Sequence, residues 1–182
     1  MDLIQKFENA KKVLEFAKSC EGVTDVRLID ARDIVVDDRV RFQCSHSGCR
    51  EYGKRFMCPP NVPDVEEFKK VLAHYIMALL IQIKGPAEDV LKLSKLLHNA
   101  VYKTEKEAFS LGFPFAAGLI GGPCNLCEKC PEGENARCIN REKARSSMEA
   151  MGIDVLKTSK NAGMNLEFKN GEITWTGLVL LD

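Results

Sequence analysis

Ile76-Met-Ala-Leu-Leu-Ile-Gln-Ile83 is the stretch that decides the fold. It is far shorter than the roughly 20 residues that a membrane-spanning helix needs, so it predicts a buried strand. Apolar residues then recur at helical spacing between Gly85-Pro86 and Gly112, which predicts a helix of about seven turns. A further strand is expected at residues 115–120. Strand, helix and strand predict a βαβ crossover, and therefore a partly parallel sheet.

The residues before this unit predict one helix, two short strands and a second helix. Apolar positions between Leu3 and Ala17 recur with helical period. The β-branched runs at residues 26–29 and 34–36 predict two antiparallel strands with a tight connection. Asp64, followed three residues later by Glu67, resembles a capping box and predicts a helix that runs to about residue 73.

The residues after the unit complete an α+β fold. Helices are expected at residues 141–151 and 154–162, each ended by a glycine. Asn170-Gly171 predicts a hairpin between a strand at 166–168 and a strand at 173–181, the latter central in the sheet. The predicted fold is a mixed β-sheet of about five or six strands with packed helices, one βαβ crossover and two cysteine-rich metal-binding loops at one end.

Two segments show neither helical nor strand periodicity. We call residues 40–63 the first cysteine segment and residues 121–140 the second cysteine segment, because they hold seven of the eight cysteines. Loops of about 20 residues are uncommon inside a compact domain unless something orders them. Since no linker divides the chain, we expect residues 1–182 to form a single domain with these two excursions.

Composition narrows the class of protein and its partners. The chain has 182 residues, of which 45% are hydrophobic and 29% are charged, so it can form a folded core. Its 26 basic and 26 acidic residues give no net charge, so we expect neither nucleic acid nor a membrane as partner. The first residues do not resemble a secretory signal, so we expect a cytoplasmic protein. Disulfides are rare in that compartment, and the spacing of the cysteines therefore matters.

The second cysteine segment carries the stronger metal-binding signal. It contains what we call the second cysteine set, which is Cys124, Cys127, Cys130 and Cys138. The first three follow the C-x2-C-x2-C pattern, and ferredoxin-type [4Fe–4S] sites combine that pattern with a more distant fourth ligand. Zinc sites more often show two separated C-x2-C pairs. The spacing favours an iron–sulfur cluster, and the alternative is a zinc ion that fastens a long loop.

The first cysteine segment is less specific. Its cysteines, which we call the first cysteine set, are Cys44, Cys49 and Cys58, and their gaps of four and eight residues match no ferredoxin pattern. A proline follows Cys58, as one follows Cys130, and this feature recurs at cluster sites. His46 is an alternative ligand. The basic residues nearby either offset the charge of a thiolate site or form a solvated loop, and these are Arg41, Arg50, Lys54 and Arg55.

The eighth cysteine and the absence of several motifs restrict the set of metal ligands and the classes of chemistry that the sequence supports. Cys20 lies near the end of the first predicted helix, far in sequence from both cysteine sets, and we expect it to fill space in the core. The sequence has no dinucleotide-binding glycine motif, P-loop, H-E-x-x-H motif or serine nucleophile elbow. These absences remove the usual marks of nucleotide and hydrolase chemistry.

The motifs CSHSGCREYGKRFMCPP (44–60) and GGPCNLCEKCP (121–131), with the segment that begins at Cys138, resemble an uncharacterised family of small cysteine-rich predicted metal-binding proteins of bacteria and archaea. The resemblance implies metal binding for both cysteine sets and implies no reaction. In that family a His-Pro pair commonly follows the last cysteine, whereas here Ile139-Asn140 follows Cys138. A proline commonly follows the next arginine, whereas Ser146 follows Arg145 here. No role is transferred for the missing histidine.

Two hypotheses for the function remain open from the sequence, and the first is an iron–sulfur redox protein that is either an electron carrier or an enzyme. Four thiolates of the second set saturate one [4Fe–4S] cluster, which suits electron transfer to a redox partner protein. Three thiolates of the first set leave one iron open, which suits an enzyme that acts on a small-molecule substrate. The alternative is a zinc-stabilised protein-binding or regulatory module. The sequence identifies neither the substrate nor the reaction.

Overall fold

A four-stranded antiparallel sheet lies at the centre of the computed structural model, which describes residues 1–164, 166 and 170–182. The strand order is β1-β2-β4-β3. The strands are β1 (Asp25–Asp30), β2 (Met77–Pro86), β3 (Ala117–Leu119) and β4 (Glu172–Leu181). The predicted α+β class is confirmed, with fewer strands in the described residues than the five or six expected.

The predicted parallel contact between β2 and β3 does not occur. Both strands pair antiparallel with β4, so they run in the same direction with β4 between them. The crossover therefore spans two strand positions, through η2 (Ala87–Asp89) and α4 (Val90–Ser110). The reason is that β4 is buried on both faces over its last residues, as a central strand must be. The central position predicted for β4 is confirmed.

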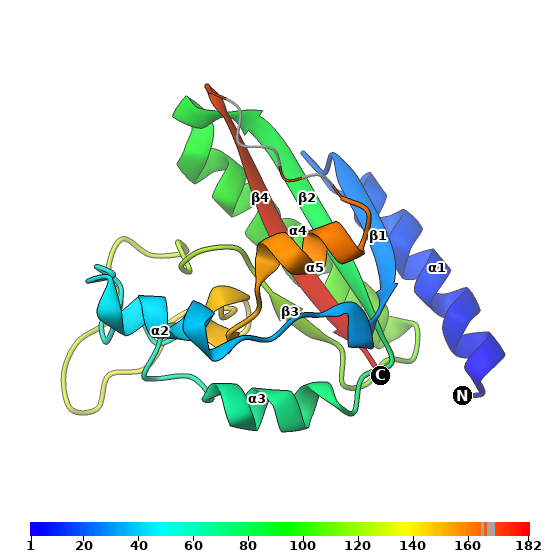
Figure 1. Ribbon diagram of the computed structural model, residues 1–182, viewed down its shortest axis with the longest axis horizontal. Coiled ribbons are helices and arrows are strands. Elements are labelled where there is room, and N and C mark those ends of the chain that lie inside the picture. The colour runs from blue at the N-terminus through cyan, green and yellow to red at the C-terminus, as the bar shows by residue number, and fades with distance from the viewer. Residues whose placement is uncertain (165, 167–169) are drawn as a thin grey trace.

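Helices cover both faces of the sheet (Figure 1). One face packs against α1 (Leu3–Ser19) and α4. The other face packs against α3 (Val65–Leu72), the short 3-10 helix η3 (Glu149–Met151) and α5 (Val155–Asn161). Leu79 and Ile81 of β2 lie in the first cluster, and Ala78 and Leu80 lie in the second. Burial on both faces explains the apolar run of β2 at residues 77–81.

Aspartate side chains cap the N-termini of three predicted helices. Asp2 accepts a hydrogen bond from the Gln5 backbone N–H at 2.8 Å, and Asp64 accepts one from that of Glu67 at 2.8 Å. Asp154 caps α5 in the same way. Each bond satisfies a backbone donor that has no partner inside the helix. These helices lie close to where the sequence predicts them.

Two predicted elements are wrong. Residues 34–36 form no strand with β1, because the chain turns through η1 (Ala31–Asp33) and leaves only an isolated bridge between Val36 and Ile153. Residues 141–151 form turns that end in η3 rather than one helix. The backbone there is held by Ile120, whose N–H donates to Ser146 O at 3.0 Å and whose carbonyl accepts from the Met148 N–H at 2.8 Å. These long-range bonds replace helical ones.

The first strand of the predicted hairpin, at residues 166–168, includes positions outside the described residues, while its second strand, at 173–181, is β4. In the described residues, no helix is long and apolar enough to cross a membrane. The interpretation of residues 1–182 as one domain stays a prediction.

Two glycines bring the second cysteine segment against β4. A Cβ atom on Gly121 would lie 2.6 Å from the Thr176 carbonyl oxygen, and one on Gly122 would lie 2.7 Å from Cζ3 of Trp175. Gly122 also has a φ of +65°, which disfavours other residues. The Trp175 ring is itself fixed, because its Nε1–H donates to Val90 O at 3.1 Å. The start of this segment is therefore built onto the sheet.

We expect Gly121→Ala to lower the free energy of unfolding by about 2 kcal/mol, the usual cost of overpacking. The added methyl group meets a backbone carbonyl that cannot move without breaking the sheet. Thermal and urea unfolding measure the change. Gly85→Ala is the control, because the nearest atoms there are the flexible end of Leu93, at 3.0 Å. Equal stability losses in the two variants would contradict the explanation.

Candidate metal centre

The first cysteine segment begins with a helix that sequence periodicity missed. α2 (Asp38–His46) contains Cys44 and has no buried residue, so it shows no apolar stripe. Its start is nonetheless signalled by Asp37, whose side chain accepts from the Arg39 N–H at 3.0 Å. The rest of the segment consists of turns that contain Cys49 and Cys58. A capping residue, rather than periodicity, was the available signal.

Arg41 fixes α2 against the body of the protein. One guanidinium nitrogen, Nη1, donates to Pro63 O at 2.5 Å and to Ala150 O at 2.6 Å. The other, Nη2, donates to Val62 O at 3.3 Å. Arg41 thus joins both ends of the first cysteine segment to η3, and it is not merely part of a solvated basic loop.

The first cysteine set gathers at one pocket of about 220 Å³. Cys44, Cys49 and Cys58 all line it, although they come from a helix and two separate turns. The wall opposite is formed by residues that follow β3 and by η3, including Gly122 and Glu149. Cys58 is buried and Cys49 is exposed, so the pocket opens toward solvent on the Cys49 side.

The environment of these thiols opposes their ionisation. Burial, together with the neighbouring Cys49, Glu51 and Cys44, raises the pKa of Cys58 to about 12. Burial also raises the pKa of Cys44, with contributions from Cys49 and Glu149. Thiolates here repel one another in a half-buried site. A bound cation removes that repulsion, and binding it releases protons.

The second cysteine segment is anchored at several points. Asn125 Nδ2 donates to the Ser94 hydroxyl of α4 at 3.3 Å, and Cys124 packs against the core beside α4. Burial raises the pKa of Cys124, and the nearby Cys138 and Cys130 add to the increase. Asn140 Nδ2 donates to Cys127 Sγ at 3.0 Å. The segment is ordered without a helix or strand.

Arg55 connects the two cysteine segments. Its Nη1 donates to the Cys127 carbonyl at 3.1 Å and its Nη2 to the Glu128 carbonyl at 3.4 Å. Its Nε pairs with Glu51, and the Arg55 side chain is only 12% exposed. The two segments therefore lie side by side at one end of the molecule, where α2 and the 121–140 loop meet in Figure 1.

Cys20 and His46 do not line the pocket of the first cysteine set. Cys20 follows α1 at its C-terminal cap and packs against the core, where burial raises its pKa. This agrees with its interpretation as a core residue. The His46 ring stacks on Phe42, with ring centroids 4.8 Å apart. His46 as a ligand stays a prediction.

The donor chemistry of the two cysteine sets fits a metal that prefers sulfur. All eight cysteines are free thiols. In residues 1–164, 166 and 170–182, no three His, Cys, Asp or Glu side chains stand close enough to hold a metal ion. Cysteine-rich sites select zinc or iron–sulfur clusters over hard cations. Both predicted ligand sets stay predictions.

Sequence reasoning missed the polar residues around the thiols. Glu149 lines the pocket of the first cysteine set, and the expected helix at 141–151 did not mark it. Asn140, which donates to Cys127 Sγ, stands two residues after Cys138. The charge of Arg55 is evident from the sequence, but the carbonyls of Cys127 and Glu128 to which it donates lie 72 and 73 positions away in the chain. No local signal indicates such contacts.

Free thiols on two adjoining segments define a candidate metal-binding protein. A family model described as "Predicted metal-binding protein (DUF2284)" matches residues 27–181, and the chain belongs to this family. The family resemblance drawn from the cysteine motifs is thereby confirmed, and the match covers both cysteine segments. The search of curated proteins found no match. The search of solved structures found none either.

Proposed function

We propose that this metal-binding protein is an iron–sulfur redox protein whose second cysteine set holds a [4Fe–4S] cluster. The observation that carries the proposal is the run Cys124, Cys127, Cys130 with Cys138, four thiols on one ordered segment without a disulfide. Such a cluster, held by four thiolates, supplies one-electron transfer. Its electrons go to or come from a redox partner protein.

The surroundings of Cys127 support this assignment. The Asn140 amide donates to Cys127 Sγ, and Arg55 donates to the Cys127 carbonyl. Hydrogen bonds to ligand sulfur and a nearby positive charge stabilise the reduced, more negative state of a thiolate-bound cluster. The protein thus provides donors where an iron–sulfur site needs them.

The pocket of the first cysteine set supports a second site with a different task. It offers three thiols, one fewer than a closed cluster needs, and it opens to solvent at Cys49. A site with one exchangeable position binds a small-molecule substrate. The protein is then a small iron–sulfur enzyme with its own electron-transfer centre.

Zinc is the second candidate, and one observation favours it. Residues 47–63 and 121–148 contain no helix or strand, and a structural zinc ion stabilises loops of this kind. The protein is then a binding or regulatory module with a protein partner. In either case we expect it in the cytoplasm, where thiols stay reduced.

Purification without oxygen separates the two candidates. We expect brown protein with a broad visible absorption that bleaches with dithionite, because thiolate-to-iron charge transfer absorbs there. Zinc has a filled d shell and gives no colour. Iron, sulfide and zinc analysis of the same sample measures the content. Colourless protein with stoichiometric zinc would exclude the iron–sulfur proposal and favour the module.

A further inference from the structure

One carboxylate shares the pocket of the first cysteine set and has no charged partner. Glu149 belongs to η3, and its side chain lines the pocket together with Cys44, Cys49 and Cys58. Its Oε2 accepts the Gly122 N–H at 3.3 Å, which is a long and weak hydrogen bond. Among the described residues it forms no ion pair.

Hydrogen bonds to the residues on either side of Glu149 hold it in this position. Arg41 of α2, the helix that contains Cys44, donates to the Ala150 carbonyl at 2.6 Å. The Asp37 N–H, at the start of the same helix, donates to Gly152 O at 2.8 Å. On the other side, the Met148 N–H donates to Ile120 O at 2.8 Å. The carboxylate therefore stands between α2 and the start of the second cysteine segment.

A second carboxylate at the pocket provides the comparison. Glu51 also lines it, but pairs with the Arg55 guanidinium, whose other nitrogens bind the second cysteine segment. The charge of Glu51 is therefore already compensated by a cation. Glu149 is the carboxylate whose charge remains available to a metal.

We infer that Glu149 becomes the fourth ligand when Cys44, Cys49 and Cys58 close around a metal in this pocket, an inference that rests on the proposed function of the pocket. Three thiols and one carboxylate complete a four-ligand set for zinc or for an iron–sulfur cluster. Carboxylate oxygen is a harder donor than thiolate and suits these metals less well. A small anionic or thiol ligand can therefore displace the Glu149 carboxylate from the metal.

The test uses full-length protein purified without oxygen, with cyanide as the probe. Electron paramagnetic resonance of the reduced protein follows the cluster signal that cyanide perturbs. We expect Glu149→Ala to bind cyanide about tenfold more tightly than wild type, the lower end of the effect of altering a metal site's surroundings. Glu149→Cys replaces the weak ligand by a thiolate, and we expect it to lose the cyanide response.

If metal analysis finds zinc in the site, the readout is chelator competition, in which Glu149→Ala should hold zinc at least about tenfold more weakly. Glu15→Gln, which changes an exposed carboxylate of α1 outside the pocket, is the control and should behave as wild type in both experiments. Far-ultraviolet circular dichroism and the signal of the second site confirm folding. The inference fails if metal is bound at the first cysteine set and Glu149→Ala matches wild type. If Cys44→Ala and Cys58→Ala lose no metal, the proposed function of the pocket fails, and the inference with it.

Discussion

Replacing Cys58 with alanine should abolish the metal centre of the first cysteine set and leave that of the second set intact. Replacing Cys138 should instead keep both centres and open one of them. Removing Cys58 reduces three thiols to two, and Cys58 is the most buried thiol of its set. Removing Cys138 leaves Cys124, Cys127 and Cys130, the closely spaced run, in place. Three thiolates on one segment still hold a cluster with an exposed iron.

Electron paramagnetic resonance of the dithionite-reduced variants, with and without cyanide, measures this difference. In Cys58→Ala one signal disappears, together with the cyanide response and about half of the iron if both sites hold the same cluster type. In Cys138→Ala both signals remain, the reduction potential of one shifts, and cyanide perturbs two centres. Cys20→Ala, outside both sets, is the control and should match wild type.

A wild-type protein with a single cluster that no probe perturbs would contradict the open-site interpretation. Cys44, Cys49 and Cys58 would then be ligands of a structural ion or ordinary thiols. Loss of both signals in Cys58→Ala, with retained helical content, would show instead that the seven cysteines serve one shared centre. Each of these outcomes therefore determines how many metal centres the chain contains.

The elements that the sequence predicts well are those whose signal is local. The run Met77–Ile83 is buried throughout, and the α4 periodicity and the Asp64 cap correspond to observed structure. The predicted order of the strands is wrong for a physical reason. Periodicity reports that a segment is buried, but not that β4, from the end of the chain, inserts between β2 and β3.

The two wrong elements have the same origin. Residues 141–151 have helical spacing, yet Ser146 and Met148 bond to the backbone of Ile120, over 25 positions away. Residues 34–36 are β-branched, yet Val35 N–H donates to the Thr158 hydroxyl at 3.0 Å rather than to β1. Tertiary contacts override local propensity in both cases.

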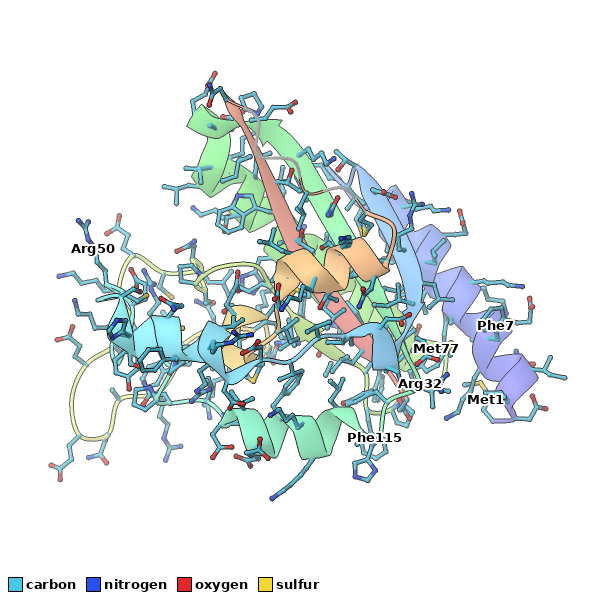
Figure 2. The ribbon with its side chains drawn as sticks, viewed as in Figure 1. Met1, Phe7, Arg32, Arg50, Met77 and Phe115 are labelled. Atoms are coloured by element: carbon cyan, nitrogen blue, oxygen red, sulfur yellow. The ribbon has the colours of Figure 1, made fainter. Side chains whose placement is uncertain are left out.

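The candidate site likewise has a part that the sequence predicts and a part that only the fold shows. Cysteine spacing marks the thiols, because ligands of one centre tend to lie close in sequence. Figure 2 shows Arg50 pointing away from the ribbon at the end of the molecule where the cysteine segments lie. Arg50 and Arg55 carry the same charge in the same segment, yet the Arg55 side chain is only 12% exposed between the two segments, whereas Arg50 is exposed. Only the fold distinguishes them.

Replacing Arg55 with alanine should therefore separate the two cysteine segments. The change removes the cation that faces Glu51 and the donors to the carbonyls of Cys127 and Glu128. Removing one partner of a fully buried ion pair costs about 3–5 kcal/mol. Because Glu51 is 30% exposed, we expect a smaller loss of about 2 kcal/mol in the free energy of unfolding.

Hydrogen exchange of backbone amides, together with thermal unfolding, tests this role. Arg55→Ala should speed exchange in residues 121–140 as well as in 47–63, although the substitution lies in the first segment only. Arg50→Ala should change neither, and its stability should stay within about 0.5 kcal/mol of wild type. Arg55→Lys retains the charge but lacks the planar fork that serves a carboxylate and two carbonyls together, so its exchange in 121–140 should resemble that of Arg55→Ala. Unchanged protection of residues 121–140 in Arg55→Ala would mean that the other contacts of that segment, such as those of Cys124 and Asn125, hold it, and that the two cysteine sets are positioned independently.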